Sequence, residues 1–326
     1  MSNIVSQDND RALTICSVSF HNARHLILNW NLTRQFNHDS ERIKWVIAEN
    51  TPEGAKDRLS FDDDRFQVIP GASGQRRISY HHTEALQKCL AHVNTRFLLI
   101  LDPDFYIVRE NWLDDIIDHM QANDLAFFGV PWHPRYIDKF RYFPTVHCTF
   151  VDLEKIPLAE LDFRPWGEDE VESGAQQKKS GPLNALWGAM TMQHRRKEFR
   201  DSGTRMYYRY AGDANVKYEC PTPVYRLPQD FPGAGNPLSL RSRIIESMLP
   251  DSLCYLPKRP SAYTDRGFPE VGFGSAFPGF WEEFMWKDMP FGFHVRRNAK
   301  KGDRDEEAEL GAIEHFLESI CPAMKS

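Results

Sequence analysis

The first 131 residues alternate between short apolar runs and longer segments in which apolar residues recur at helical spacing. Short runs rich in β-branched residues predict strands, and recurrence every three or four residues predicts an amphipathic helix. We therefore expect strands at 13–20, 43–50, 65–71, 96–105 and 125–131, and helices at 21–36, 78–93 and 111–124. Strands that alternate with helices are typical of an α/β fold.

The regular alternation stops after Pro131. From there to about residue 190 the chain holds clusters of Pro, Gly, His and aromatic residues with little periodicity. For this irregular half we expect strands at 146–153 and 216–220, a helix over 199–212 capped by Asp201 or Ser202, and an amphipathic helix over 306–320. No repeat or low-complexity tract divides the chain, so we expect a disordered N-terminus at 1–10 and a single domain over 11–326.

Composition narrows the class of protein. With 326 residues, 41% of them hydrophobic, the chain can bury a substantial core. A net charge of -6 and a pI near 6.1 argue against a nucleic-acid binder, whose phosphate contacts need a basic surplus. The six cysteines form no C-x-x-C pair, and neither a signal peptide nor an apolar run of membrane-spanning length is present, so we expect a cytoplasmic protein.

Two carboxylates follow the most apolar of the predicted strands. In FLLILDPDFYI, Asp102 and Asp104 flank Pro103, which stiffens the turn, and both carboxylates can reach one hard cation. Open α/β sheets bind ligands beyond the carboxyl ends of their strands. An isolated D-x-D pair is more typical of a solvated turn, but its position after a buried strand favours a metal and phosphate site.

This arrangement resembles the GT-A glycosyltransferases, and most closely glycosyltransferase family 2, over roughly residues 13–153. The resemblance implies a GT-A (Rossmann-like) α/β fold: a mixed, mostly parallel sheet flanked by helices, with an irregular C-terminal half. Residues 11–131 would bind a nucleotide sugar, 132–298 would bind the acceptor, and 299–326 would form a helical tail. The implied reaction is a hexosyl transfer from a nucleoside-diphosphate sugar to a hydroxyl of a glycan or glycoconjugate, as in polysaccharide assembly. The resemblance implies no nucleic-acid partner, and it is compatible with peripheral contact between the protein and a membrane.

The resemblance also implies which residues hold the donor. They are polar or charged and stand at predicted strand ends, at a helix start or in a late basic segment: Ser19, His21, Asn22, Glu49, Asn50, His82, Asp102, Arg296 and Arg297. The first three match the turn that contacts the nucleoside, and Glu49 matches an acidic position at the base or ribose. Each is equally typical of a cap or turn.

The metal ligands implied by the resemblance are Asp102, Asp104 and His294 of PFGFHVRRNAKK. The ion would be Mn²⁺ or Mg²⁺, and it would act as a Lewis acid for the departing nucleoside diphosphate. Oxygen ligands suit either ion, so the sequence does not choose between them.

An inverting transfer also needs a general base for the acceptor hydroxyl. Asp201 in FRDSGTRMYYRY matches the family's position, although Arg200 stands where a Glu is common. Asp201 is also a typical helix N-cap, and Glu168 or Asp169 in PWGEDE are the alternatives.

Three other functions are compatible with parts of the pattern. A D-x-D phosphatase would carry its motif on the first strand, whereas three strands precede this one. A sugar nucleotidyltransferase would need a Gly-rich phosphate loop near the N-terminus, which is missing. A catalytically degenerate GT-A protein that only binds carbohydrate is favoured by Arg200 and disfavoured by the intact carboxylate pair.

Overall fold

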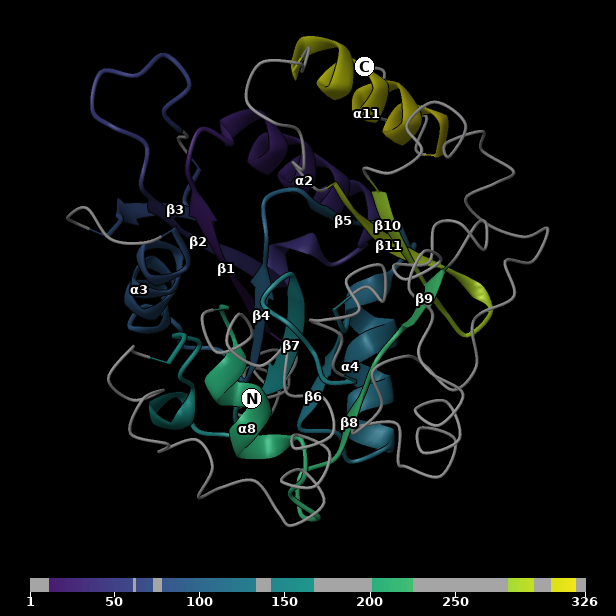
Figure 1. Cartoon of the computed structure of the whole chain (residues 1–326). Helices are drawn as coiled ribbons and strands as arrows, with labels where there is room; N and C mark the ends of the chain where they lie inside the picture. The colour runs from purple at the N-terminus through teal and green to yellow at the C-terminus, as the bar shows by residue number, and fades with distance from the viewer. Residues whose placement is uncertain are drawn as a thin grey trace, which may run out of the picture.

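A computed structural model describes residues 12–60, 63–72, 78–132, 142–166, 201–224, 281–295 and 306–320. Within these ranges the chain forms two sheets and the helices that cover them (Figure 1). Every helix in the described ranges is too short or too polar to span a lipid bilayer. The predicted disordered N-terminus lies outside the described residues.

The larger sheet has seven strands in the order β3-β2-β1-β4-β7-β6-β8. Its strands are β1 (Leu13–Ser19), β2 (Ile43–Glu49), β3 (Phe66–Pro70), β4 (Phe97–Leu101), β6 (Phe127–Gly129), β7 (Cys148–Asp152) and β8 (Tyr218–Glu219). All neighbours pair in parallel except at β7, which runs antiparallel to both β4 and β6. The predicted α/β class with a mixed, mostly parallel sheet is confirmed.

Helices cover both faces of this sheet. On one face, α3 (Ile78–Leu90) and α8 (Thr204–Tyr210) pack over the apolar side chains of the central strands. On the other face lie α2 (Ala23–Phe36) and α4 (Trp112–Ala122), and α11 (Glu306–Ile320) belongs to the same hydrophobic core. The central strands β1 and β4 are buried throughout because both faces are covered, and β4 is entirely apolar. Short 3₁₀ helices span Ser40–Arg42 and Leu158–Glu160.

The smaller sheet is antiparallel, with the order β5-β11-β10-β9. It consists of β5 (Phe105–Ile107), β9 (Thr222–Val224), β10 (Trp281–Trp286) and β11 (Met289–Val295). Its aromatic residues join the same core as α2, α4 and α11. β5 follows β4 by one short turn, so a segment of the regular N-terminal half pairs directly with strands from the C-terminal half.

Two element predictions need correction. The strand expected over 96–105 ends at Leu101, because the Phe105 N–H bonds the Asp102 carbonyl and turns the chain into the second sheet. The helix expected over 199–212 begins at Thr204. Its N-cap is Gly203 in the left-handed region at φ 81°, so neither Asp201 nor Ser202 caps it. The C-terminal helix over 306–320 is confirmed.

Candidate metal and nucleotide site

The Asp102-Pro103-Asp104 turn lies at the carboxyl end of β4, next to the end of the neighbouring strand β1. Helix α2 holds it from one side, because the buried Asn29 amide donates hydrogen bonds to the carbonyls of Pro103 (2.7 Å) and Phe105 (3.0 Å). On the other side, the Asp102 N–H bonds the His147 carbonyl at 3.0 Å. These hydrogen bonds hold the backbone of the turn that carries both carboxylates.

Asp102 lies between two histidines. His147 immediately precedes β7, whose Cys148 pairs with Leu101 of β4, and its Nδ1 lies 2.6 Å from Asp102 Oδ2. His82, from the first turns of α3, places Nε2 3.5 Å from Oδ1. Burial opposes ionisation of this carboxyl, but the hydrogen bond with His147 and the charge of His82 outweigh it and lower the pKa of Asp102.

Asp104 directly precedes β5 and faces His294 of the neighbouring strand β11. His294 pairs with Phe105 in the β11–β5 ladder, and its Nε2 lies 3.3 Å from Asp104 Oδ1. The other ring nitrogen, Nδ1, lies 3.0 Å from the buried Glu282 carboxylate of β10. Burial lowers the pKa of His294, but the Asp104 and Glu282 carboxylates together raise it to about 10. The cluster therefore attracts positive charge.

Ligand atoms of Asp102, His147 and His294 all lie within 4.8 Å of one another, which is close enough to share one metal ion. The rings of His147 and His294 stack with their centroids 4.4 Å apart. Carboxylate oxygen and imidazole nitrogen both bind divalent cations, so these residues fit a metal of the kind that the sequence predicted. With Asp104 beside His294, the structure brings together the three predicted metal residues and adds His147.

Two predicted donor residues, Glu49 and Asn50, anchor loops. The Glu49 carboxylate accepts hydrogen bonds from the N–H groups of Thr51 (2.7 Å) and Leu59 (2.8 Å). The Asn50 Oδ1 accepts one from Ala72 N–H at 2.7 Å. These contacts set the shape of the chain beyond β2. A direct contact of either residue with the nucleotide-sugar donor stays a prediction.

The turn after β1 contains the other predicted nucleoside contacts. Ser19 is fully buried, and its hydroxyl has no hydrogen-bond partner within the described residues. His21 adopts a left-handed conformation at φ 56°, bonds Thr51 Oγ1 through its N–H, and places Nδ1 2.7 Å from Asp57. A strained residue at this place is typical of a binding loop.

His21 and Asn22 also line a cavity of about 430 Å³ between the start of α2, residues 56–60 and α11. Neither aspartate of the turn lines it, nor does His82, His147 or His294. The metal cluster and this cavity are therefore separate features.

Phe20 is the one residue of the β1 turn whose large apolar ring is exposed. Its ring is 51% exposed and meets His81 edge-on, with 6.5 Å between centroids. His81 is the chain neighbour of His82, which contacts Asp102. Phe20 and Asp102 thus lie on the same side of the sheet, facing the first turns of α3.

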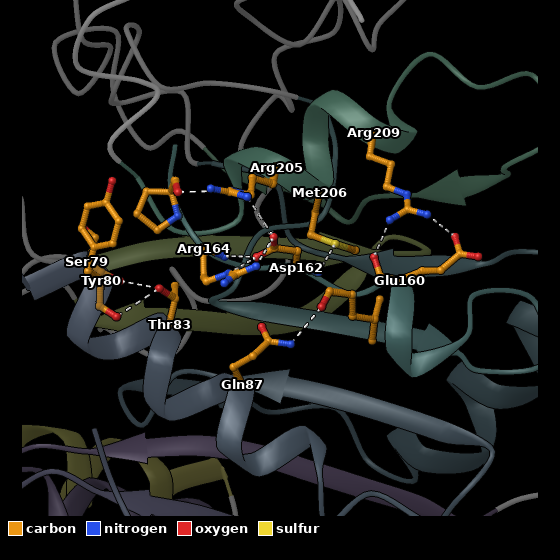
Figure 2. Close-up of polar contacts among 12 residues, drawn as sticks. Ser79, Tyr80, Thr83, Gln87, Glu160, Asp162, Arg164, Arg205, Met206 and Arg209 are labelled. Atoms are coloured by element: carbon orange, nitrogen blue, oxygen red, sulfur yellow. Dashed lines mark hydrogen bonds and ion pairs between the residues drawn. The ribbon is translucent and has the colours of Figure 1, made fainter. Parts of the chain in front are cut away.

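The predicted base, Asp201, precedes α8, and its carbonyl accepts a hydrogen bond from Thr204. Gly203 bonds the Phe163 carbonyl and packs against Val146, the neighbour of His147. Figure 2 shows how α8 is held: Arg205 bonds Asp162, and Arg209 bonds Glu160. Glu168, Asp169, Arg296 and Arg297 lie outside the described residues.

Sequence reasoning missed three residues of this site: Phe20, His147 and Glu282. His147 was assigned to the strand predicted over 146–153, and no local pattern indicates that this strand pairs with β4. Glu282 lies in a segment for which no strand was predicted. Phe20 was assigned to the apolar run of β1.

Comparisons with known proteins give structural similarities only. No protein-family model matches the chain, and no curated protein matches it. It is similar to the mannosyltransferase PcManGT from Pyrobaculum calidifontis in complex with GDP-Man and Mn²⁺, with 11% identity and a TM-score of 0.33 over 44% of this chain and 45% of that one. It is similar to S. aureus TarS 1–349 in complex with UDP-GlcNAc, with 12% identity and a TM-score of 0.32 over 47% of this chain and 48% of that one.

A third similar structure is the galactosyltransferase LgtC in complex with donor and acceptor sugar analogs, with 12% identity and a TM-score of 0.35 over 63% of this chain and 72% of that one. This chain spans less than half the length of the PcManGT and TarS 1–349 chains. At these identities and TM-scores the similarities carry no conclusion about the activity of this chain.

Proposed function

We propose that this chain is a metal-dependent glycosyltransferase that moves a sugar from a nucleoside-diphosphate sugar to an acceptor hydroxyl. The observation that supports it most is the convergence of Asp102, His147 and His294 beyond the carboxyl end of β4, with Asp104 paired to His294 at 3.3 Å. This strand is central in the sheet, and ligands of open α/β sheets bind beyond such strand ends.

The cation-binding residues would be Asp102, Asp104 and His294. When bound, Mn²⁺ or Mg²⁺ supplies a Lewis acid that neutralises the negative charge of the departing diphosphate. The Glu282 carboxylate orients the His294 ring through Nδ1 and leaves Nε2 facing Asp104.

The nucleoside would lie along the ends of β1 and β4, on the side covered by α3. Phe20 offers an exposed ring face there. Stacking of a base on an aromatic ring contributes about 1–3 kcal/mol. His82, whose Nε2 lies 3.5 Å from Asp102 Oδ1, would contact a phosphate or the ribose.

We assign the role of general base to Asp201, in an in-line displacement that inverts the anomeric carbon. The support is its chain position beside Gly203, which packs on Val146 next to His147. Asp201 would take the proton of the acceptor hydroxyl as the bond to the anomeric carbon forms. An Asp201→Asn variant should bind donor and metal normally but lose transfer, and the anomeric configuration of the wild-type product checks inversion.

The central test is calorimetric titration of UDP, GDP, dTDP and CDP, each with and without Mn²⁺. We expect one diphosphate to bind in a metal-dependent way, and Asp104→Asn to abolish that binding. The matched control is Asp114→Asn, which removes a carboxylate that pairs with Arg42 at 2.7 Å, away from the cluster.

Failure of all four diphosphates to bind, with or without metal, would refute the proposal. Metal-dependent binding without any sugar transfer or donor hydrolysis would instead identify a carbohydrate-binding protein. Hydrolysis of a generic phosphate monoester without nucleotide binding would identify a phosphatase.

A further inference from the structure

We propose that His147 is itself a metal ligand and that, together with His294, it makes this site one for a first-row transition ion that Mg²⁺ displaces poorly. The inference concerns the same site as the proposed function, and it deepens that function by naming the ion class. It goes beyond the three predicted ligands, because His147 directly precedes β7, a strand whose pairing with β4 only the structure reveals.

The spacing of the donor atoms supports a shared ion. Two ligand atoms that each lie about 2.1 Å from a cation, at right angles to each other, are about 3 Å apart. The pairs here are separated by 2.6 Å (His147 Nδ1 to Asp102 Oδ2) and 3.3 Å (His294 Nε2 to Asp104 Oδ1). Each histidine–carboxylate pair therefore has roughly the separation of adjacent ligands on a metal. The two pairs are linked because ligand atoms of Asp102, His147 and His294 all lie within 4.8 Å of one another.

The two rings are also held in place. His147 and His294 are both buried and stack at 27° between ring planes. Trp132 packs edge-on against His147 at 4.6 Å, and Glu282 bonds the far nitrogen of His294. Because neighbouring side chains fix both rings, little rotamer freedom is lost when a cation binds.

The chemistry of this donor set decides the ion. Mg²⁺ prefers oxygen ligands in near-ideal octahedral geometry and keeps several waters. Imidazole suits transition ions, and affinity rises from Mn²⁺ towards Cu²⁺ for a given nitrogen and oxygen site. Two imidazoles beside two carboxylates therefore favour Mn²⁺, Fe²⁺, Co²⁺ or Zn²⁺ over Mg²⁺.

The competing explanation is that His147 only donates a hydrogen bond to Asp102 and positions that carboxylate. His147→Asn separates the two, because an Asn amide can still donate near the place of Nδ1 but offers no imidazole lone pair. If His147 merely positions Asp102, this variant keeps the metal affinity. If His147 is a ligand, the variant loses it.

The experiment is a titration of the 326-residue chain with Mn²⁺ in the absence of nucleotide, in which free Mn²⁺ is followed by electron paramagnetic resonance and Mg²⁺ is then added as competitor. We expect His147→Asn to weaken Mn²⁺ binding about tenfold or more and to narrow the preference for Mn²⁺ over Mg²⁺. His119→Asn is the matched control, because His119 also pairs with a carboxylate (Glu219, 2.9 Å) but lies on α4, outside the cluster. It should leave both quantities unchanged.

A measurement on the wild type guards against a variant that fails to fold. Spin-echo modulation from nitrogen in the Mn²⁺ complex should count two coordinated imidazoles. Any of four results would overturn the inference: a count of one imidazole or none, unchanged Mn²⁺ affinity in His147→Asn, equal competition by Mg²⁺, or no Mn²⁺ binding by the wild type. If Mg²⁺ and Mn²⁺ supported nucleotide binding equally, the inference about the ion would be wrong but the proposed function would stand. If the chain bound Mn²⁺ selectively but had no affinity for nucleotides, the inference about the ion would stand and the proposed function would be wrong.

Discussion

Phe20 and Met289 are the two large apolar side chains that are exposed within the described residues, at 51% and 57%. Exposure of a large ring beside a polar site has a cost in solvation, and a ligand that covers the ring would offset that cost. The rings of His21 and His81 lie beside Phe20, and in the proposed function a nucleoside base covers it. Met289 lies at the start of β11, in the second sheet.

Phe20→Ala should therefore weaken binding of the nucleoside diphosphate without loss of stability. Removal of one stacked base contact corresponds to about 1–3 kcal/mol, or roughly five- to more than a hundredfold in Kd. Calorimetry with the preferred diphosphate and Mn²⁺ measures the change, and a melting curve checks that the fold is intact. Met289→Ala serves as the control, and equal effects of the two substitutions would contradict the assignment.

Single residues show what the sequence can and cannot predict about this site. Asp102 and Asp104 are predictable because their signal is local: an apolar strand followed at once by two carboxylates. His294 was predicted only from its late position in a resembling family. His147 and Glu282 act through partners that are 45 and 12 residues away in the sequence, so their roles depend on strand pairing that no local pattern encodes.

Helix α2 covers the large sheet and also holds the segment that follows β4. Asn29 and His25 both point at the segment after β4: Asn29 bonds the carbonyls of Pro103 and Phe105, and His25 Nδ1 lies 2.6 Å from the Tyr106 hydroxyl. The helix thus fixes the turn that carries both carboxylates.

Asn29→Ala should lower both stability and metal affinity. Two buried carbonyls would lose their donor, and each costs about 1–3 kcal/mol when it is left unsatisfied. Chemical denaturation and Mn²⁺ titration measure the two effects. Asn37→Ala is the matched control: this buried Asn joins the end of α2 to the N–H of Leu113 at 2.8 Å, so it should lower stability alone. If both variants kept full metal affinity, the holding role of α2 would be wrong.

Elements also mark the limit of periodicity as a predictor. Apolar spacing predicted α2, α3, α4 and α11 and the parallel strands, because each shows its own buried face in its own residues. It missed β5, whose first residue, Phe105, was taken as the end of the preceding strand, and it placed the start of α8 too early. In both cases a backbone turn decided the outcome, through the Asp102–Phe105 hydrogen bond and the left-handed Gly203.

At the scale of the whole molecule, the candidate site is the place where the two sheets meet. Asp102 and His147 come from the large sheet, whereas His294 and Glu282 come from the small one. Helix α11 adds a second link, because Phe316 packs on Phe293 of β11, while Glu307 and Glu314 pair with Arg24 of α2 (Figure 1). These ion pairs are largely exposed and contribute little, so the apolar contact matters more.

A cation bound at this junction should therefore stabilise both sheets together. Ligand binding to the folded state adds about 2.7 kcal/mol at a free concentration of a hundred times Kd, which we expect to raise the melting temperature by roughly 5 °C. Hydrogen exchange gives the spatial test: Mn²⁺ should increase protection in β4, in β7 and in the β10–β11 hairpin, with a smaller change in β2 and β3 at the far edge. Chelation should reverse the effect, and Asp104→Asn should be insensitive to both treatments. Protection confined to one sheet would show that the ion does not bridge them, because an ion held by Asp102 and His147 alone has no mechanical connection to β11.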